Sequence, residues 1–388
     1  MDTLPPAGAE DSAGSAAPRA RVLAFYLPQF HPIPENDLWW GKGFTEWTNV
    51  ARARPLFPGH EQPRLPADLG FYDLRLPEAR EAQADLARAH GVEGFCYWHY
   101  WFGGGRRILE RPFAEVLASG RPDFPFCLAW ANQTWSGVWF GDPKHILIRQ
   151  TYPGLEDERD HFLALLPAFR DPRQIRVDGK PMFIIFAPDE MPDAGAFIEH
   201  WRRLAAEHGL PGLFLVGMTN RFDTPAFAGF DALTAIPPND FINTRPGGAL
   251  RNLGRLIRER HFGRRFNRLF GESLRRPRRF DYAEVAPAVA GLLPPGERYL
   301  PCVLPNWDNT PRSGPRGYVF ENATPALFGR YLRDAVRRVA DRPAQRRIVF
   351  VKAWNEWAEG NYLEPDARHG LGFLAALKAE VAGESPPP

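Results

Sequence analysis

Eight short apolar segments recur along the chain, and most are followed by polar or aromatic residues and then by a stretch with helical periodicity. The apolar segments are Val22–Leu27, Val92–Tyr97, Phe124–Trp130, Pro181–Phe186, Leu213–Gly217, Ala232–Ile236, Tyr299–Leu304 and Ile348–Ala353. The amphipathic stretches between them are Pro77–His90, Ile108–Ser119, Leu155–Phe169, Ala194–His208 and Pro325–Ala340. Eight alternating strand and helix units in one chain predict a (β/α)8 barrel.

An open, doubly wound α/β sheet is the alternative for such a pattern. That fold usually carries a glycine-rich phosphate-binding loop after its first strand, and here the position holds Pro28-Gln29-Phe30-His31-Pro32 instead. We therefore favour a single barrel domain over residues 21–380, preceded by a disordered tail over residues 1–20.

The amino-acid composition indicates a globular protein with a large core, and its net charge indicates no particular binding partner. The 388 residues are 44% hydrophobic, enough for a large core, and the formal net charge is only +2. The three cysteines (Cys96, Cys127 and Cys302) are odd in number and lack metal-ligand spacing, so we expect buried thiols, no metal and no cofactor. Residues 1–20 lack the apolar core of a signal peptide, and no long apolar run predicts a membrane span, so we expect a cytoplasmic protein.

A basic segment over residues 246–279 follows the sixth predicted strand and contains eleven arginines interleaved with leucine, isoleucine and phenylalanine. One interpretation is a solvated helical insertion. The other is an amphipathic basic surface that contacts anionic lipid at the inner membrane or an anionic polysaccharide. No nucleic-acid-binding motif accompanies the charge, so we expect no nucleic acid partner.

The strongest chemical signal follows the last apolar segment, in the run from Ala353 to Gly360. Side chains three apart on a strand face opposite ways, so Glu356 and Glu359 can converge only if the chain turns between them, which Gly360 permits. Two carboxyl groups beside Trp354 and Asn355 suit sugar chemistry, because indoles stack on sugar rings, amides bind hydroxyls and acids transfer protons. The motif contains no Lys or Arg to neutralise the pair, and burying carboxylates is costly, so a catalytic role is favoured.

Polar and aromatic residues also gather at the ends of other predicted strands, where a barrel forms its active site. The candidates for substrate binding are Tyr26, Gln29, His31, Glu46, Trp47 and Asn49 after the first strand, Tyr97, Trp98, His99 and Tyr100 at the second, Trp130 and Asn132 at the third, Trp307, Asp308, Asn309 and Arg312 at the seventh, and Trp354 and Asn355 at the eighth. Structural alternatives stay open: a core position for His31 and His99, and a loop-ordering ion pair for Asp308 with Arg312.

Taken together, these residues resemble the WbsX-type proteins of bacterial polysaccharide gene sets, which are described as glycoside hydrolase family 99-like. The resemblance covers nearly all of Arg21 to Phe373. The segments that carry it are Ala24–Pro32, Gly43–Val50, Gly94–Trp101, Trp130–Asn132, Trp307–Arg312 and Trp354–Gly360.

Family 99 contains retaining endo-α-mannosidases on a (β/α)8 barrel, whose catalytic strand end reads Asn-Glu-Trp-x-Glu-Gly, as Asn355 to Gly360 do here. The resemblance implies that Glu356 assists deprotonation of the sugar 2-hydroxyl and that Glu359 acts as general acid and then as base. Asn355 and Glu46 would bind hydroxyls. The indoles that would stack on sugars are those of Trp47, Trp98, Trp130 and Trp307.

We therefore expect a carbohydrate-active enzyme that cleaves or transfers a glycosidic bond in a surface polysaccharide or its lipid-linked precursor. Many relatives are labelled glycosyltransferases, so a transferase that uses a nucleotide sugar is the first alternative. The Asp-x-Asp motif of metal-dependent transferases is absent from the sequence. A glycan-binding protein without catalysis is the second alternative, and the intact pair of glutamates argues against it.

Overall fold

The computed structural model describes residues 18–137, 142–222, 224, 227–238 and 276–383. The predicted N-terminal tail lies outside the described residues apart from 18–20, and so does the predicted basic insertion apart from 276–279. Both predictions therefore stay predictions.

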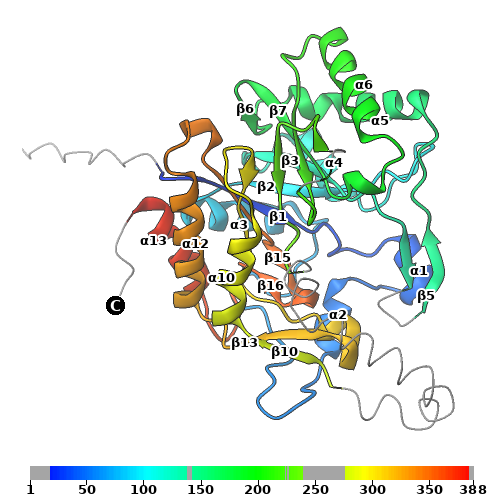
Figure 1. The fold of residues 1–388 in the computed structure, drawn as a ribbon. Helices are drawn as coiled ribbons and strands as arrows, with labels where there is room; N and C mark the ends of the chain where they lie inside the picture. Colours follow the sequence, from blue (N-terminus) through cyan, green and yellow to red (C-terminus); the bar gives the residue numbers. More distant parts are fainter. Residues whose placement is uncertain (1–17, 138–141, 223, 225–226, 239–275, 384–388) are drawn as a thin grey trace, which may run out of the picture.

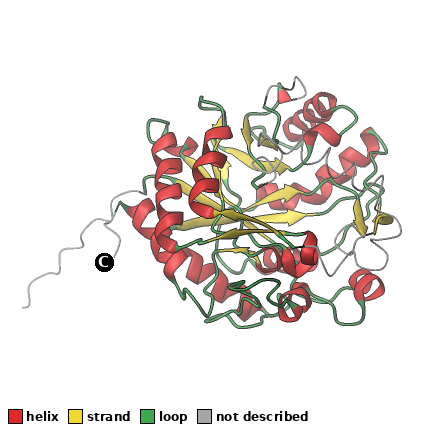
Figure 2. Ribbon diagram, turned by 60° about the horizontal axis from the view of Figure 1, so that its bottom comes forward, coloured by secondary structure: helices red, strands yellow, loops and turns green. Residues whose placement is uncertain are grey.

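A closed parallel barrel forms the centre of the molecule (Figures 1 and 2). Its strands are β1 (Arg21–Tyr26), β2 (Val92–His99), β3 (Phe126–Trp130), β7 (Lys180–Ile185), β8 (Phe214–Met218), β9 (Ala232–Thr234), β11 (Tyr299–Leu300), β12 (Cys302–Val303) and β14 (Ile348–Val351). The hydrogen-bonded order is β11-β9-β8-β7-β3-β2-β1-β14-β12. Only Pro301 separates β11 from β12, and these two segments pair with β9 and β14 respectively, so together they fill the seventh position and close the barrel. The predicted (β/α)8 fold is confirmed.

Helices surround this barrel, as Figure 2 shows. They are α3 (Pro77–Ala89), α4 (Arg111–Ser119), α5 (Leu155–Arg170), α6 (Ala194–Glu207), α10 (Tyr282–Leu292), α12 (Pro325–Val339) and α13 (Gly372–Ala382). The five predicted amphipathic stretches correspond to α3, α4, α5, α6 and α12. Helices α10 and α13 were not predicted, because their apolar residues are not confined to one face and so lack the periodicity that marks the other helices.

The loops after the strands carry the remaining elements. The loop after β1 holds α1 (Pro34–Trp40) and α2 (Glu46–Arg52), and a hairpin of β4 (Trp135–Gly137) and β5 (Asp142–Ile148) follows β3. The helix α11 (Thr310–Ser313) follows β12, and the hairpin of β15 (Asn355–Glu356) and β16 (Asn361–Tyr362) follows β14. Two smaller pairs complete the fold: β6 (Arg176–Val177) with β7, and β10 (Arg278–Asp281) with β13 (Tyr318–Glu321). The loops that follow β1, β3, β12 and β14 leave the carboxyl ends of their strands, where barrels place their binding sites.

Side-chain alternation along the strands separates the barrel interior from the helical layer. Phe25 stacks on Trp98 with ring centroids 4.9 Å apart, whereas the neighbouring Tyr26 donates its hydroxyl hydrogen bond to Gln83 on α3. Period-two alternation is a property of any strand, but the barrel decides which set of side chains faces inward. No helix within the described ranges is long and apolar enough to cross a membrane.

Candidate active site

The last barrel strand leads directly into a tight hairpin that carries both glutamates. Asn355 and Glu356 pair antiparallel with Tyr362 and Asn361, and residues 357–359 form a single 3-10 turn between the two strands. Gly360 closes the turn with φ at +59°, and a Cβ there would lie 2.8 Å from the Cβ of Asp308. The chain therefore turns between Glu356 and Glu359, and both side chains line one cavity.

Asn355 anchors the hairpin to the first strand. Its side-chain oxygen accepts a hydrogen bond from the Leu27 amide at 2.8 Å, and its amide group donates to the Leu27 carbonyl at 3.1 Å and to the Tyr72 hydroxyl at 3.3 Å. Asn355 is fully buried and does not line the cavity. In this arrangement its amide positions the neighbouring Glu356.

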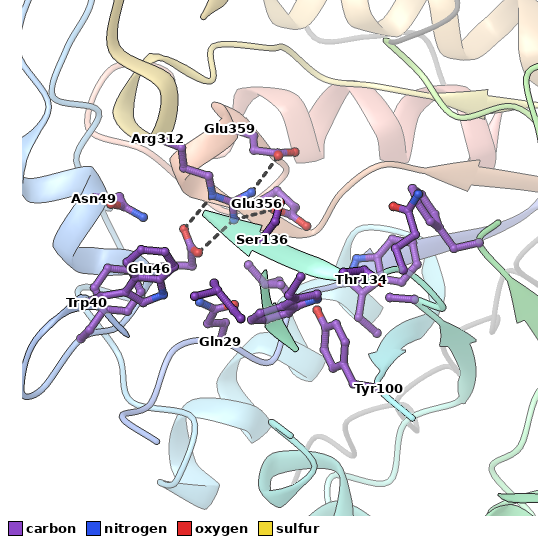
Figure 3. A pocket seen from close by; sticks show the side chains of 18 of the residues that line it. Gln29, Trp40, Glu46, Asn49, Tyr100, Thr134, Ser136, Arg312, Glu356 and Glu359 are labelled. Carbon is purple, nitrogen blue, oxygen red and sulfur yellow. Dashed lines mark hydrogen bonds and ion pairs between the residues drawn. The ribbon is translucent and has the colours of Figure 1, made fainter. Parts of the chain in front are cut away.

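Arg312 lies among three buried carboxyl groups, as Figure 3 shows. Its nitrogen Nη1 lies 2.7 Å from Glu359, and Nη2 lies 3.2 Å from Glu356 and 3.0 Å from Glu46. The Nε group also donates to Glu46 at 3.2 Å. The loop after β12 thus supplies the cation, Arg312, and the loop after β1 supplies a third carboxyl group, Glu46. Neither group is part of the motif that follows β14.

Burial and charge shift the protonation equilibria of this cluster. Burial and the neighbouring Glu359 raise the pKa of Glu356 to about 7, against the opposing charges of Arg312 and Lys352. Burial also raises the pKa of Glu46, although Arg312 acts in the opposite direction. The carboxylates raise the pKa of the Arg312 guanidinium although its burial opposes them. A carboxyl group with a pKa near neutrality can give or take a proton under physiological conditions, which general acid–base chemistry requires.

The cavity at this end of the barrel has a volume of about 300 Å³. The predicted site residues that line it are Gln29, Glu46, Asn49, Trp98, Tyr100, Arg312, Glu356 and Glu359. The lining residues outside that prediction are Leu27, Trp40, Phe44, Ala131, Gln133, Thr134, Trp135, Ser136, Leu147, Phe186 and Lys352. Several of these residues belong to the aromatic and polar segments at the strand ends, so the sequence could have indicated them. Leu147 on β5 and Phe186 after β7 lie outside such segments.

Four predicted tryptophans do not line the cavity. Trp47 donates to the Tyr72 carbonyl at 2.8 Å, and Trp130 donates to the Trp101 carbonyl at 3.0 Å. Trp307 stacks on Tyr318 with centroids 6.1 Å apart, and Trp354 packs against Phe95 at 5.1 Å. These indoles support the walls of the site, and Trp98, Trp40 and Trp135 are the indoles at the cavity itself.

The two predicted histidines also lie outside the cavity lining. His99 and His161 are buried with their Nε2 atoms 2.8 Å apart, and burial lowers the pKa of His99 to about 3, so it stays neutral. His31 donates from Nδ1 to the Pro28 carbonyl at 3.0 Å. These positions match the structural interpretation that the sequence left open for both residues.

The remaining predicted residues support the loops around the site. The Tyr26 hydroxyl is bonded to Gln83, Tyr97 packs against Phe113 on α4, and Asn132 bridges the amide and carbonyl of Ala187. The side chain of Asn309 accepts a hydrogen bond from the Tyr318 amide at 2.9 Å.

Asp308 joins the loop after β12 to the hairpin of β15 and β16. Its carboxylate accepts hydrogen bonds from His60 at 2.9 Å and from Gln62 at 2.7 Å, and its amide donates to the Glu359 carbonyl at 2.6 Å. Burial acts to raise the pKa of Asp308, but the His60 hydrogen bond and the Arg64 charge lower it overall. The ionised Asp308 therefore orders the loop on which Arg312 lies.

No group of three His, Cys, Asp or Glu side chains arranged to hold a metal ion occurs among the residues with described positions. The polar groups that line the cavity are carboxyl groups, two cations, amides, hydroxyls and indoles.

Solved structures described as glycoside hydrolases have a similar barrel fold. A glycoside hydrolase-like protein superposes with a TM-score of 0.56 at 16% identity, over 98% of this chain and 97% of that one. The GH99 endo-alpha-mannosidase from Bacteroides thetaiotaomicron superposes with a TM-score of 0.55 at 13% identity, over 95% and 98%.

The chain belongs to the family described as Glycosyltransferase WbsX, which residues 22–377 match. The uncharacterized protein WxcX of Xanthomonas campestris pv. campestris is 40% identical over 364 residues, which is 92% of this chain. The chain spans 49% of the length of that relative.

Proposed function

We propose that this protein is a carbohydrate-active enzyme that cleaves or transfers a glycosidic bond in bacterial surface polysaccharide metabolism. The observation that carries the proposal is the buried pair Glu356 and Glu359, which line one cavity together with the indole of Trp98. The family and the barrel fold support the same class of chemistry.

Glu356 would take the proton from the sugar 2-hydroxyl, and a pKa near 7 makes its carboxylate a stronger base than an ordinary one. Glu359 would protonate the leaving oxygen and then deprotonate the attacking water or sugar hydroxyl. The oxocarbenium-like transition state of such reactions is stabilised by the negative charge of the partner carboxylate. Gln29 and Asn49 line the same cavity and would bind sugar hydroxyls, and the ring of Trp98 would stack on a sugar face.

A nucleotide-sugar-dependent glycosyltransferase is the second candidate, because the family to which the chain belongs is described as a glycosyltransferase. In that case the cavity would bind the transferred sugar, and the product would grow only when an activated donor is supplied.

The test is mass spectrometry of glycans after incubation with purified wild-type protein, with Glu359→Gln and with the exposed control Glu207→Gln. Each protein is mixed with polysaccharide or lipid-linked oligosaccharide from the native host, with and without nucleotide sugars. Shortened or rearranged glycans with wild type and Glu207→Gln, without a nucleotide sugar, are expected. Products that grow by one sugar only with a nucleotide sugar would establish the transferase instead.

A further inference from the structure

The arginine at the centre of the site contacts its three carboxyl partners unequally. Two nitrogens of Arg312 contact Glu46, through Nε at 3.2 Å and Nη2 at 3.0 Å. Nη1 lies 2.7 Å from Glu359, and Nη2 lies at the longer distance of 3.2 Å from Glu356. A planar guanidinium cannot turn one nitrogen without moving the others, so the anchor on Glu46 fixes which glutamate receives the shorter contact.

The charges of the cavity do not balance when every carboxyl group is ionised. Three carboxylates face Arg312 and Lys352, and like charges in one buried site favour retention of a proton by one of them. The other titratable groups that face the glutamates are Tyr100 and Tyr318. Burial raises the pKa of Tyr100, and it raises the pKa of Tyr318 to about 12, so both phenols stay neutral at pH 7.

We propose that Arg312, anchored on Glu46, keeps Glu359 ionised in the empty site and leaves the proton of the pair on Glu356. The short, charge-assisted contact to Glu359 stabilises its ionised form, whereas Glu356 has the weaker contact. The raised pKa of Glu356 agrees with this placement. Arg312 is then a positioning residue that determines the protonation state of both glutamates.

This inference rests on the proposed function for its mechanistic consequence. A general acid at Glu359 needs the proton that the empty site holds on Glu356. One proton must therefore leave the Glu356 carboxyl group and be taken up by the Glu359 carboxylate, with no change in the net charge of the cavity. Because the guanidinium opposes that transfer, the Glu359 side chain has to move away from Arg312 when a sugar enters, while Glu46 retains the arginine.

The experiment is carbon NMR of the free protein labelled at the glutamate carboxyl carbon, titrated between pH 4 and 9. Glu356→Gln and Glu359→Gln assign the two resonances. In wild type, the Glu356 resonance is expected to move near neutral pH, and the Glu359 resonance is expected not to move in that range. In Arg312→Met, the Glu359 resonance is expected to move in the same neutral range, because the pair then shares its proton without a bias.

Two further variants show whether a change in the titration is specific to the guanidinium of Arg312. Arg316→Met, on the exposed part of the same loop, is expected to titrate as wild type does. Arg312→Lys retains a charge without the fork and is expected to lie between wild type and Arg312→Met, which covers the case in which Arg312→Met does not fold. A wild-type Glu359 resonance that moves near neutral pH, or identical titrations of wild type and both Arg312 variants, would overturn the proposal.

The titration needs no substrate, so it is independent of the glycan assay. Loss of the proposed function would show as intact glycans with wild type whatever the NMR result. Glycan cleavage together with an unbiased titration would overturn the role of Arg312 alone.

Discussion

Glu356 and Glu364 are buried carboxyl groups near the two ends of the hairpin of β15 and β16, and they have different neighbours. Glu356 lines the cavity beside Arg312 and Lys352, whereas Glu364 lies beyond the hairpin and outside the cavity lining. Glu364 accepts neutral hydrogen bonds from Tyr72 at 2.9 Å, from Gln83 at 2.6 Å and from Trp357 at 2.6 Å.

Burial raises the pKa of both groups to about 7. A shifted pKa alone therefore does not identify a catalytic residue. The difference lies in what each carboxyl group can reach: Glu356 faces the cavity, whereas the oxygens of Glu364 accept hydrogen bonds from Tyr72, Gln83 and Trp357.

The substitution Glu356→Gln tests most directly whether Glu356 has the catalytic role that we assign to it. The substitution preserves the shape of the side chain and removes its acid–base function, so turnover should fall by about 100- to 10,000-fold. The melting temperature should change little. Kinetics on a glycan that wild type processes, together with thermal unfolding, would measure both, and near-normal turnover would contradict the catalytic assignment.

The pH dependence of stability tests what the two groups share. Both carboxyl groups have folded-state pKa values above the ordinary value, so the folded protein binds protons more tightly than the unfolded chain does. Their contribution is fully present below about pH 4.5 and is lost as the pH rises to about 7, by up to about 3 kcal/mol for each group. Urea unfolding between pH 4.5 and 8 would measure the slope. It should be shallower in Glu356→Gln and in Glu364→Gln, and equal slopes in all three proteins would contradict the burial argument.

Glu364→Gln separates structure from catalysis. Its amide cannot accept all three hydrogen bonds, because one of its two terminal atoms is now a donor facing the Gln83 amide. The free energy of unfolding at pH 5 should fall by about 1–3 kcal/mol. Turnover should fall less than in Glu356→Gln, and a larger loss of turnover with unchanged stability would place Glu364 in the chemistry.

Lys352→Met should have the smallest effect and concerns Glu356 alone. Lys352 lowers the pKa of Glu356, so its removal should raise that pKa further. The midpoint of the Glu356 titration should move upward by about one pH unit or less. The Glu364 midpoint should stay in place. The carboxyl titration described above measures both in one sample, and a downward movement of the Glu356 midpoint would contradict the expected sign.

Much of the fold could be predicted because parallel barrel strands are buried on both faces and appear as uninterrupted apolar runs. Seven of the eight runs match strands within about three residues, and the run at Tyr299–Leu304 is divided only at Pro301. Helix α10 was missed because its apolar residues are not confined to one face.

The candidate site was predictable only as a set of strand ends. On β2 and the residue after it, alternate side chains reach different places: Trp98 and Tyr100 line the cavity, whereas Tyr97 packs against α4 and His99 bonds to His161 on α5. Any strand places alternate side chains on opposite faces, but which of the two sets faces the cavity depends on how the barrel closes.

The sequence by itself determined the barrel, the pairing of Glu356 with Glu359 and the need for a turn between them, because each follows from local periodicity and from one motif. Only the tertiary structure decided that Arg312 and Glu46 meet this pair, and that Trp47, Trp130 and His99 support the walls. Residues at the ends of six barrel strands line the cavity over separations of up to several hundred positions, and no local pattern records which of them touch. The protonation of the site is therefore a property of the closed barrel, since it depends on burial and on charges contributed by distant parts of the chain.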